Sequence, residues 1–202
     1  MRYDDPQARC LRFFVVSVVQ EDFIMTAVST AEHIIARPVQ TDDDWWRVRN
    51  LLIETYPITP VDFNWEIRRW DGWRNYCEDD GEYQTRKTSI CLWETDDGRL
   101  VGAAHPEDPG TLHVQLHPDY RHLEDDMIAW GEEHLAVPAD DGQQRRLDIF
   151  ALDYNAPRQR VLTERGYEKM PWSGVSRRLL FGNWPLPTPV IADGYTLRTT
   201  TP

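Results

Sequence analysis

The apolar positions near residue 34 have the spacing of a strand, and those after residue 41 have the spacing of a helix. Residues 34–39 predict a short strand. Thr41 then offers an N-cap, and three aspartates follow it, where the helix dipole favours negative charge. Trp45, Val48 and Leu52 recur at helical spacing. We therefore expect a helix with a core-facing stripe directly after the first strand.

A second helix is predicted where Phe63, Ile67, Trp70, Trp73 and Cys77 share one face. Apolar side chains at this spacing are usually buried, so core packing is the first interpretation. The alternative is that the tryptophans line a groove for an acceptor molecule.

Three strand-like stretches come next, at residues 88–94, 100–104 and 111–117. The turn-forming segments 96–98 and 106–110 separate them, which predicts an antiparallel meander. In the third stretch apolar and polar residues alternate, so one face should be apolar and the other polar.

The remaining pattern predicts a helix over 124–136, a buried strand over 146–152, a helix over 157–165 and a strand over 175–181. Gly166 suits the left-handed position that ends a helix.

Three regions are expected along the chain. Residues 1–30 are an N-terminal extension that need not belong to the fold, and residues 31–182 form the domain. Residues 183–202 are a proline-rich linker and the start of a second repeat. The repeat is suggested because residues 194–198 are similar to residues 35–37.

Composition narrows the classes of partner. The formal net charge of −12 would repel nucleic acid and anionic membrane surfaces, and would attract an amine. Tuning of solubility explains that charge equally well. Cys10, Cys77 and Cys91 lie far apart, which argues against a disulfide framework and predicts a cytoplasmic protein. The apolar run 11–19 is too short for a membrane helix.

Two local motifs match a known family. One is the segment 116–121, Leu-His-Pro-Asp-Tyr-Arg, and the other is Asn155 with Arg165-Gly166-Tyr167. With the order of elements, they make residues 34–181 resemble the GNAT acetyltransferase superfamily. The resemblance implies an α/β (α+β) fold whose mainly antiparallel central sheet carries helices on both faces. It also implies transfer of an acetyl group from acetyl-CoA to a small-molecule or peptide amine, and a second GNAT-like domain C-terminal to this chain.

In that family a loop of pattern Gln/Arg-x-x-Gly-x-Gly/Ala holds the acyl-CoA pyrophosphate through backbone N–H groups. Here Arg121 matches, but Glu124 and Asp126 replace the glycines. A carboxylate about 4 Å from a phosphate costs on the order of 4 kcal/mol at an effective dielectric near 20. Alternatively, the acids cap the following helix. The residues implied to hold the cofactor are Leu116, His117, Arg121, His122, Leu123, Glu124, Asp125, Asp126 and Asn155.

Acyl transfer to an amine needs a base, and the family often uses a tyrosine as the acid. Leu162 occupies the position of that tyrosine. The catalytic candidates are His117 and His113, with Glu94, as base, and Tyr167, with Tyr154, as acid. Tyr167 is equally well explained as a core aromatic, and a strand histidine is commonly a hydrogen-bonded structural residue.

No metal site is expected. His105, His113, His117 and His122 are spaced so that several share a strand face, but no HExxH pair or thiolate cluster accompanies them.

The sequence leaves three functions open. The first is an acetyl-CoA-dependent N-acyltransferase. The second is a degenerate, non-catalytic GNAT-like module that binds a partner domain or another ligand. The third is an interaction protein whose tryptophans form an exposed docking face.

Overall fold

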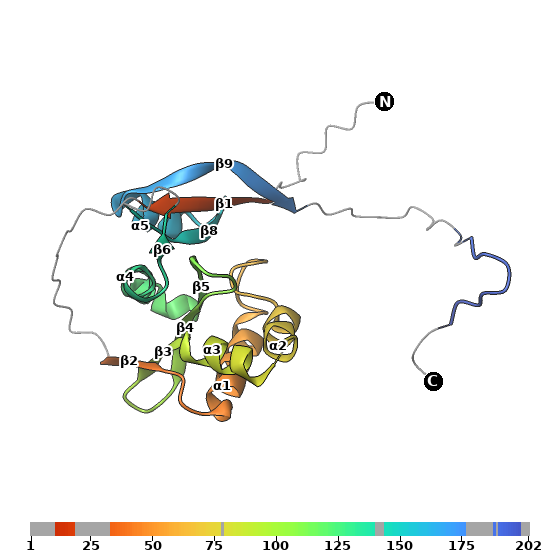
Figure 1. Cartoon of the computed structure of the whole chain (residues 1–202), viewed down its shortest axis with the longest axis horizontal. Coiled ribbons are helices and arrows are strands. Elements are labelled where there is room, and N and C mark those ends of the chain that lie inside the picture. Colours follow the sequence, from red (N-terminus) through yellow and green to blue (C-terminus); the bar gives the residue numbers. More distant parts are fainter. Residues whose placement is uncertain are drawn as a thin grey trace.

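The sheet of this chain is mixed and mainly antiparallel (Figure 1). The computed structural model describes residues 11–18, 33–77, 79–139, 144–176, 188 and 190–198. Its strands are β1 (Leu11–Val18), β2 (Ile34–Pro38), β3 (Cys91–Thr95), β4 (Leu100–His105), β5 (Thr111–Leu116), β8 (Asp148–Leu152) and β9 (Tyr167–Ser176). They lie in the order β2-β3-β4-β5-β8-β1-β9, and only β5 and β8 pair in parallel. A two-stranded sheet is formed by β6 (Val137–Pro138) and β7 (Arg145–Arg146).

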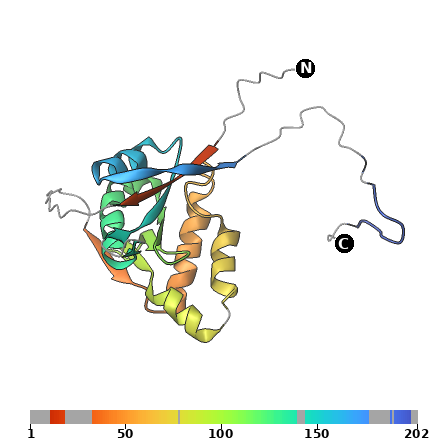
Figure 2. The same cartoon turned by 45° about the horizontal axis from the view of Figure 1, so that its top comes forward.

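Helices cover both faces of the main sheet, as Figure 2 shows. They are α1 (Asp42–Thr55), α2 (Ile67–Asn75), α3 (Asp80–Thr88), α4 (Glu124–His134) and α5 (Ala156–Glu164), with a 3₁₀ helix η1 (Pro118–Leu123) before α4. Residues of α1 and α2 share one buried cluster, and residues of α4 and α5 share the other. The predicted fold class, a mixed α/β fold with a mainly antiparallel sheet, is confirmed.

The first predicted helix forms as expected. Its stripe is buried, because Trp45, Val48 and Leu52 are each at most 1% exposed. Asp44 caps the helix by accepting the backbone N–H groups of Gln40 at 2.9 Å and Thr41 at 3.2 Å. These bonds satisfy donors that a helix start would otherwise leave unpaired.

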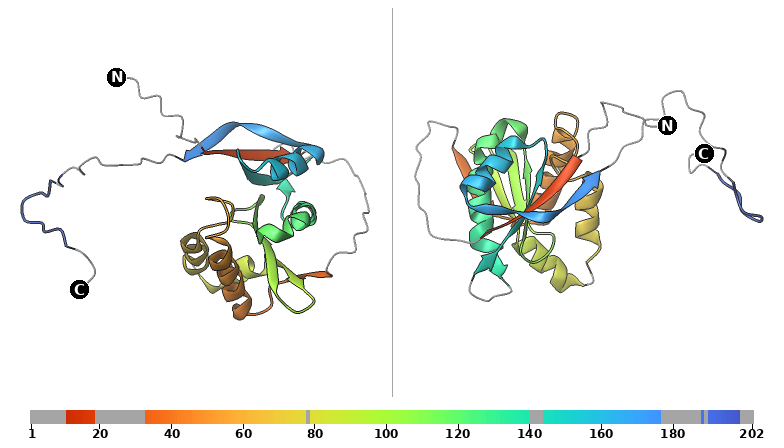
Figure 3. Two further views of the ribbon diagram at one scale, coloured as in Figure 1. Left: turned by 180° about the vertical axis from the view of Figure 1, so that it is seen from behind. Right: turned by 90° about the horizontal axis from the view of Figure 1, so that it is seen from above.

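Residues 11–18 correct the prediction that residues 1–30 need not belong to the fold. Strand β1 lies between β8 and β9 and pairs antiparallel with both (Figure 3). Phe14, for example, is opposite Ala151 of β8 and Ser173 of β9. The apolar run Leu-Arg-Phe-Phe-Val-Val-Ser-Val is consistent with a buried strand, but it does not indicate which distant strands it pairs with. Residues 1–10 and 19–32 lie outside the part of the chain that the structure describes.

The starts of two other strands differ from the prediction. Strand β9 begins at Tyr167, directly after Gly166 with its φ of 84°, and not at Val175. Helix α3, which was not predicted, takes residues expected to begin β3. Residues 177–181 lie outside the described part of the chain. Residues 194–198, expected to open a second repeat, form neither helix nor strand.

The polar face of β5 is buried, which the alternation alone did not predict. His113 is 7% exposed and Gln115 is 1% exposed. On the other face α4 packs closely against β5 at Gly131. A Cβ there would lie only 2.5 Å from the Leu112 side chain, so glycine permits this approach. Strand β5 is therefore covered on both sides, and its polar side chains need partners within the protein.

Candidate functional site

A cavity of about 930 Å³ lies beside the strands β5 and β8. Its opposite wall comes from α2 and from the segment before it, residues 62–66. Within the described strands, β5 and β8 pair only at Thr111 with Asp148 and at Leu112 with Ile149. We call this space the α2 cavity. The side chains at its wall that matter below are Trp65, Trp73, Glu107, His113, Phe150 and Arg158.

A chain of hydrogen bonds fixes the protons on the polar face of β5. His105 Nδ1 donates to the carbonyl oxygen of Pro106 at 2.9 Å, so its Nε2 accepts from Gln115 Nε2 at 2.9 Å. Gln115 Oε1 accepts the backbone N–H of Trp65 at 2.7 Å. The indole Nε1 of Trp65 donates to His113 Nδ1 at 3.0 Å. Because Nδ1 accepts, neutral His113 carries its proton on Nε2.

His113 is consequently a hydrogen-bond donor at the cavity wall. Burial is the largest cause that lowers its pKa well below the ordinary value, and the charges of Arg69 and Arg158 act in the same direction. Its Nε2 has no hydrogen-bond partner among the described residues, and Glu107 Oε2 lies 3.6 Å away. The sequence suggested His113 as a base. The geometry is unfavourable for that role, because the nitrogen that could accept a proton is bonded to Trp65.

Acidification is expected to destabilise the fold through these histidines. Burial lowers the pKa of His105 to about 3, from 6.5 in the unfolded chain. Between those values the unfolded chain binds a proton that the folded chain excludes, so stability falls as the pH falls. From about pH 7.5 to about pH 5, His105 should cost about 2 kcal/mol, and the lowered pKa of His113 adds to the loss. Urea unfolding at both pH values measures it. A His105→Gln variant should lose less over the interval, and an equal loss would contradict the assignment.

The predicted cofactor loop contains a buried carboxylate held by two arginines. Glu124 is 2% exposed, and it accepts from Arg158 Nε and, at 2.7 Å, from Arg121 Nη2. Arg121 Nη2 also donates to Asn155 Oδ1 at 2.7 Å. Burial raises the pKa of Glu124, but the charges of Arg158 and Arg121 outweigh it and hold the pKa below its ordinary value. We call these four residues the Glu124 cluster.

A donor of this cluster is buried beside the α2 cavity without a hydrogen-bond partner among the described residues. Arg158 is 6% exposed, and its Nη2 has no hydrogen-bond partner among the described residues. Its Nη1 donates to the carbonyl oxygen of Phe150 at 3.3 Å. The Phe150 ring stacks on His113 with 5.2 Å between centroids. Phe150 thus links the two unpaired donors, Arg158 Nη2 and His113 Nε2.

Several backbone N–H groups of the turn before α4 donate hydrogen bonds within that turn. Asp119 N donates to His117 Nδ1 at 3.3 Å, and Tyr120 N donates to the carbonyl oxygen of His117 at 3.0 Å. Glu124 N donates to the carbonyl oxygen of Arg121. His117, a predicted base and cofactor residue, is therefore the cap of η1, and it is not among the residues that line the α2 cavity.

Leu116 and Leu123, both predicted cofactor contacts, have structural roles. The side chain of Asn64 bonds both backbone groups of Leu116, accepting from its N at 2.9 Å and donating to its O at 3.0 Å. Leu123 is 5% exposed in the core. The remaining predicted cofactor residues outside the cluster, His122, Asp125 and Asp126, are exposed.

The tyrosine candidates lie away from the α2 cavity. Tyr167 is 7% exposed, and burial, followed by the carboxylate of Glu132, raises its pKa far above the ordinary value. The hydroxyl of Tyr154 donates to the carbonyl oxygen of Val61 at 2.7 Å, and burial raises its pKa to about 12. Leu162 is 2% exposed in the core. None of these three lines the α2 cavity.

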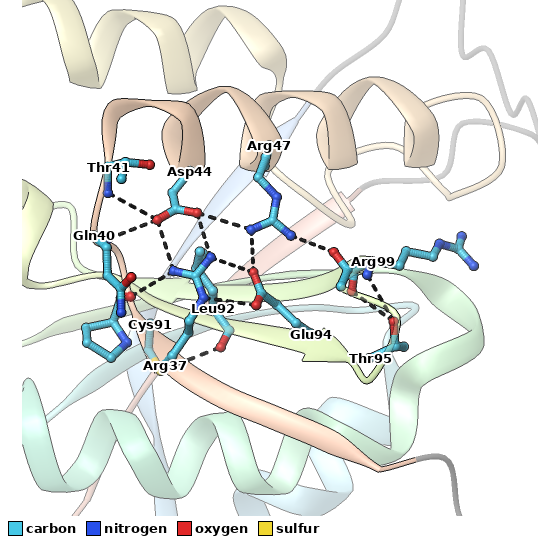
Figure 4. Close-up of polar contacts among 12 residues, drawn as sticks. Arg37, Gln40, Thr41, Asp44, Arg47, Cys91, Leu92, Glu94, Thr95 and Arg99 are labelled. Atoms are coloured by element: carbon cyan, nitrogen blue, oxygen red, sulfur yellow. Dashed lines mark hydrogen bonds and ion pairs between the residues drawn. The ribbon is translucent and has the colours of Figure 1, made fainter.

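Glu94, the third base candidate, belongs to a network of ion pairs that joins β2, α1 and β3 (Figure 4). It accepts from Arg37 Nη2 at 2.7 Å and from Arg47. Arg37 also bonds Asp44 at 2.6 Å, and this contact is the main reason that the pKa of Asp44 is lowered. Two arginines hold Glu94 in place, so its role is structural.

Of the tryptophans in and next to the second helix, one packs only in the core and two also line the α2 cavity. Trp70 is fully buried, as core packing predicts, and stacks on Trp45 with 4.3 Å between centroids. Trp65 and Trp73, which are 8% and 7% exposed, belong to the same cluster and also line the α2 cavity. The third helix residue of the stripe, Ile67, is partly buried.

Sequence reasoning missed Arg158, Trp65 and Gln115. Arg158 precedes Leu162 by four residues on α5, so helical spacing places both on the inward face. That spacing was a usable signal for a buried arginine. Trp65 lies in a loop, and its pairing with His113 has no local signal.

A membrane-spanning helix and a metal-holding group of side chains are both absent from the part of the chain that the structure describes. None of its helices has the length and apolar character needed to cross a bilayer. No three or more histidine, cysteine, aspartate or glutamate side chains are grouped there so as to hold a metal ion.

No family model matches this sequence, and no curated protein matches it. Among solved structures, a Drosophila protein from a structural genomics consortium has a TM-score of 0.45 at 16% identity, over 80% of this chain and 48% of that one. A functionally unknown conserved protein from Staphylococcus epidermidis has a TM-score of 0.44 at 9% identity, over 82% of this chain and 60% of that one. This chain thus spans about half to three-fifths of their lengths. Likeness at this level assigns no function.

Proposed function

We propose that this chain is a GNAT-like acyltransferase domain that binds a small ligand in the α2 cavity and no longer grips the acyl-CoA pyrophosphate. The observation that carries the proposal is the Glu124 cluster. At the position of a family glycine, a buried carboxylate neutralises the two arginines nearest to it. The resemblance to the acetyltransferases supports the class of fold, and the Glu124 cluster argues against binding of acyl-CoA.

A pyrophosphate would have to displace Glu124 from Arg121 and Arg158. That exchange would leave a carboxylate that is 2% exposed without its partners. Breaking a buried ion pair typically costs about 3–5 kcal/mol. Of the loop amides, that of Glu124 is already hydrogen-bonded to the carbonyl oxygen of Arg121, so it is not free for the phosphate.

The candidate catalytic groups favour binding over turnover. The position of the family tyrosine is the buried Leu162, and Tyr154 already donates its hydroxyl proton to Val61. His113 has a free N–H where a base needs a free lone pair. The cavity combines an aromatic wall with charged side chains, as a ligand site does.

Removing the carboxylate should create affinity for CoA. In Glu124→Gly with Asp126→Gly, both arginines lose their internal anion, and we expect saturable binding of CoA by calorimetry. Asp126→Gly alone is the matched control, because Asp126 is exposed and has no part in the cluster. The natural chain and this control should give no saturable heat at millimolar CoA. Equal, tight binding by all three proteins would overturn the proposal.

A second candidate is an acetyl-CoA-dependent N-acyltransferase acting on a small-molecule or peptide amine. One observation favours it: His113 Nε2 and Arg158 Nη2 are unpaired donors near a common ring, Phe150. Such donors could polarise a thioester carbonyl. Release of the CoA thiol from acetyl-CoA, dependent on an added amine and lost in His113→Asn, would establish this activity. The cytoplasmic location and a second GNAT-like domain beyond this chain remain predictions.

A further inference from the structure

The α2 cavity offers donors without matching acceptors at the wall formed by β5, β8 and α5. His113 Nε2 and Arg158 Nη2 are both buried and have no hydrogen-bond partner among the described residues. Unpaired buried donors are costly, so they are uncommon without a reason. With Trp73 Nε1, three such donors belong to residues that line one cavity, which points to a ligand that supplies the acceptors.

The polarity of this wall is fixed and cannot adapt to a ligand that donates. An indole N–H only donates, so Trp65 obliges His113 to accept at Nδ1 and to present a proton at Nε2. A guanidinium also only donates. A bound amine would find donors facing its own N–H groups.

The charged groups nearest to the two donors are two arginines and two carboxylates. In the Glu124 cluster, Arg121 and Arg158 carry two positive charges against the one negative charge of Glu124. Glu107, the carboxylate nearest to His113, forms a bidentate ion pair with Arg69. The lining as a whole is balanced, with Arg68, Arg69, Arg86 and Arg158 against Asp62, Glu66, Asp71 and Glu107, so the preference for an anion comes from the two donors and not from a net charge.

Aromatic side chains line the cavity on both sides. Trp65 and Trp73 line the cavity from the α2 side, and Phe150 lines it from β8. Arg69 lies 4.2 Å from the centre of the Trp65 ring, which fixes that indole between the guanidinium and the sheet. Aromatic surfaces of this kind favour a planar or apolar ligand body.

We infer that the α2 cavity binds a carboxylate carried on a flat apolar body, with its oxygens accepting from His113 Nε2 and Arg158 Nη2. This inference rests on the proposed function as a ligand-binding domain and gives the chemical class of the ligand. It replaces the amine expected from the resemblance with an anion.

Three probes with one indole body test the class: indole-3-acetate, indole-3-acetamide and tryptamine, each titrated calorimetrically into the whole chain. A hydrogen bond to a charged group predicts that the acetate binds roughly 10- to 100-fold more tightly than the amide. Tryptamine should bind most weakly. Tryptamine binding as tightly as the acetate, or all three binding equally, would overturn the inference, as would no binding of the acetate at millimolar concentration.

His113→Asn is the informative variant. The asparagine oxygen can still accept from Trp65, but the Nε2–H donor is gone, so the acetate should lose about tenfold or more in affinity. The amide should lose less. Arg68→Gln removes a charge from the exposed rim of the cavity and is the control, expected to change the affinity by no more than about threefold. Equal losses in the two variants would indicate general charge attraction and contradict the inference.

A second readout needs no variant. The ¹⁵N spectrum of His113 should show the Nε2–H tautomer in the free protein and a shifted Nε2 on addition of indole-3-acetate. An Nδ1–H tautomer would overturn the argument. Acetyl-CoA, titrated in parallel, separates the two proposals: its binding would contradict the proposed function, whereas the order of the three indoles judges the ligand class alone.

Discussion

Replacing Arg158 with methionine is expected to lower the free energy of unfolding by about 3–5 kcal/mol. Arg158 is 6% exposed and bonds Glu124, which is 2% exposed. Without Arg158 the carboxylate keeps only Arg121, so it is left buried and incompletely compensated. Urea unfolding at neutral pH measures the loss.

Two further variants show whether the ion pair is the cause. Arg121→Met should cost less, because the Arg121 side chain is 29% exposed and water can replace it. In the double variant Glu124→Met with Arg158→Met both charges are absent, and most of the loss should be recovered. If the double variant is as unstable as Arg158→Met, the loss comes from packing and the electrostatic account is wrong.

Replacing Trp45 with alanine is expected to destabilise the fold by about 3–5 kcal/mol. Trp45 is 1% exposed and stacks on Trp70 at 4.3 Å and on Trp73 at 5.4 Å between centroids. Its deletion leaves a large void beneath α2. The buried Nε1 of Trp45 has no hydrogen-bond partner in the described part of the chain, so no polar partner is lost with it.

Trp46 provides a control of the same residue type at the next position of α1. It is 47% exposed, so Trp46→Ala should cost less than about 1 kcal/mol. Thermal and urea unfolding of both variants measure the difference. Similar losses in the two proteins would contradict the assignment of Trp45 to the core. Since Trp73 also lines the α2 cavity, Trp45→Ala should weaken ligand binding as well.

Elements whose signals are local were predicted well. The aspartates after Thr41 and the stripe of Trp45, Val48 and Leu52 gave α1, and its start is confirmed. Gly166 was expected in a left-handed conformation, and its φ is 84°. The antiparallel order of β3, β4 and β5 followed from their alternation and turns. In each case a few neighbouring residues determine the structure.

Elements that depend on distant partners were not predicted. Strand β1 pairs with β8 and β9, and its own sequence does not indicate which strands it pairs with. Helix α3 has few apolar residues, so it has no stripe to detect. Its N-terminal signal is Asp79, whose side chain accepts from Glu82 N at 2.8 Å, and this cap was overlooked.

The candidate site shows the same division. The sequence identified Glu124 as a departure from the family loop, and predicted that it would repel a phosphate or cap a helix. It could not show that Glu124 turns inward, because Arg158, its main partner, is 34 residues away. Likewise, His113 was recognised as titratable, but its proton is placed by Trp65, 48 residues away in the chain.

The central claim is that the Glu124 cluster takes the place of the acyl-CoA pyrophosphate, and thermal unfolding of the natural chain with excess acetyl-CoA tests it most directly. A ligand that binds only the native state must raise the melting temperature. The account predicts no rise at millimolar acetyl-CoA. A saturable rise that depends on the acetyl-CoA concentration would contradict it and would favour an acetyl-CoA-dependent acyltransferase.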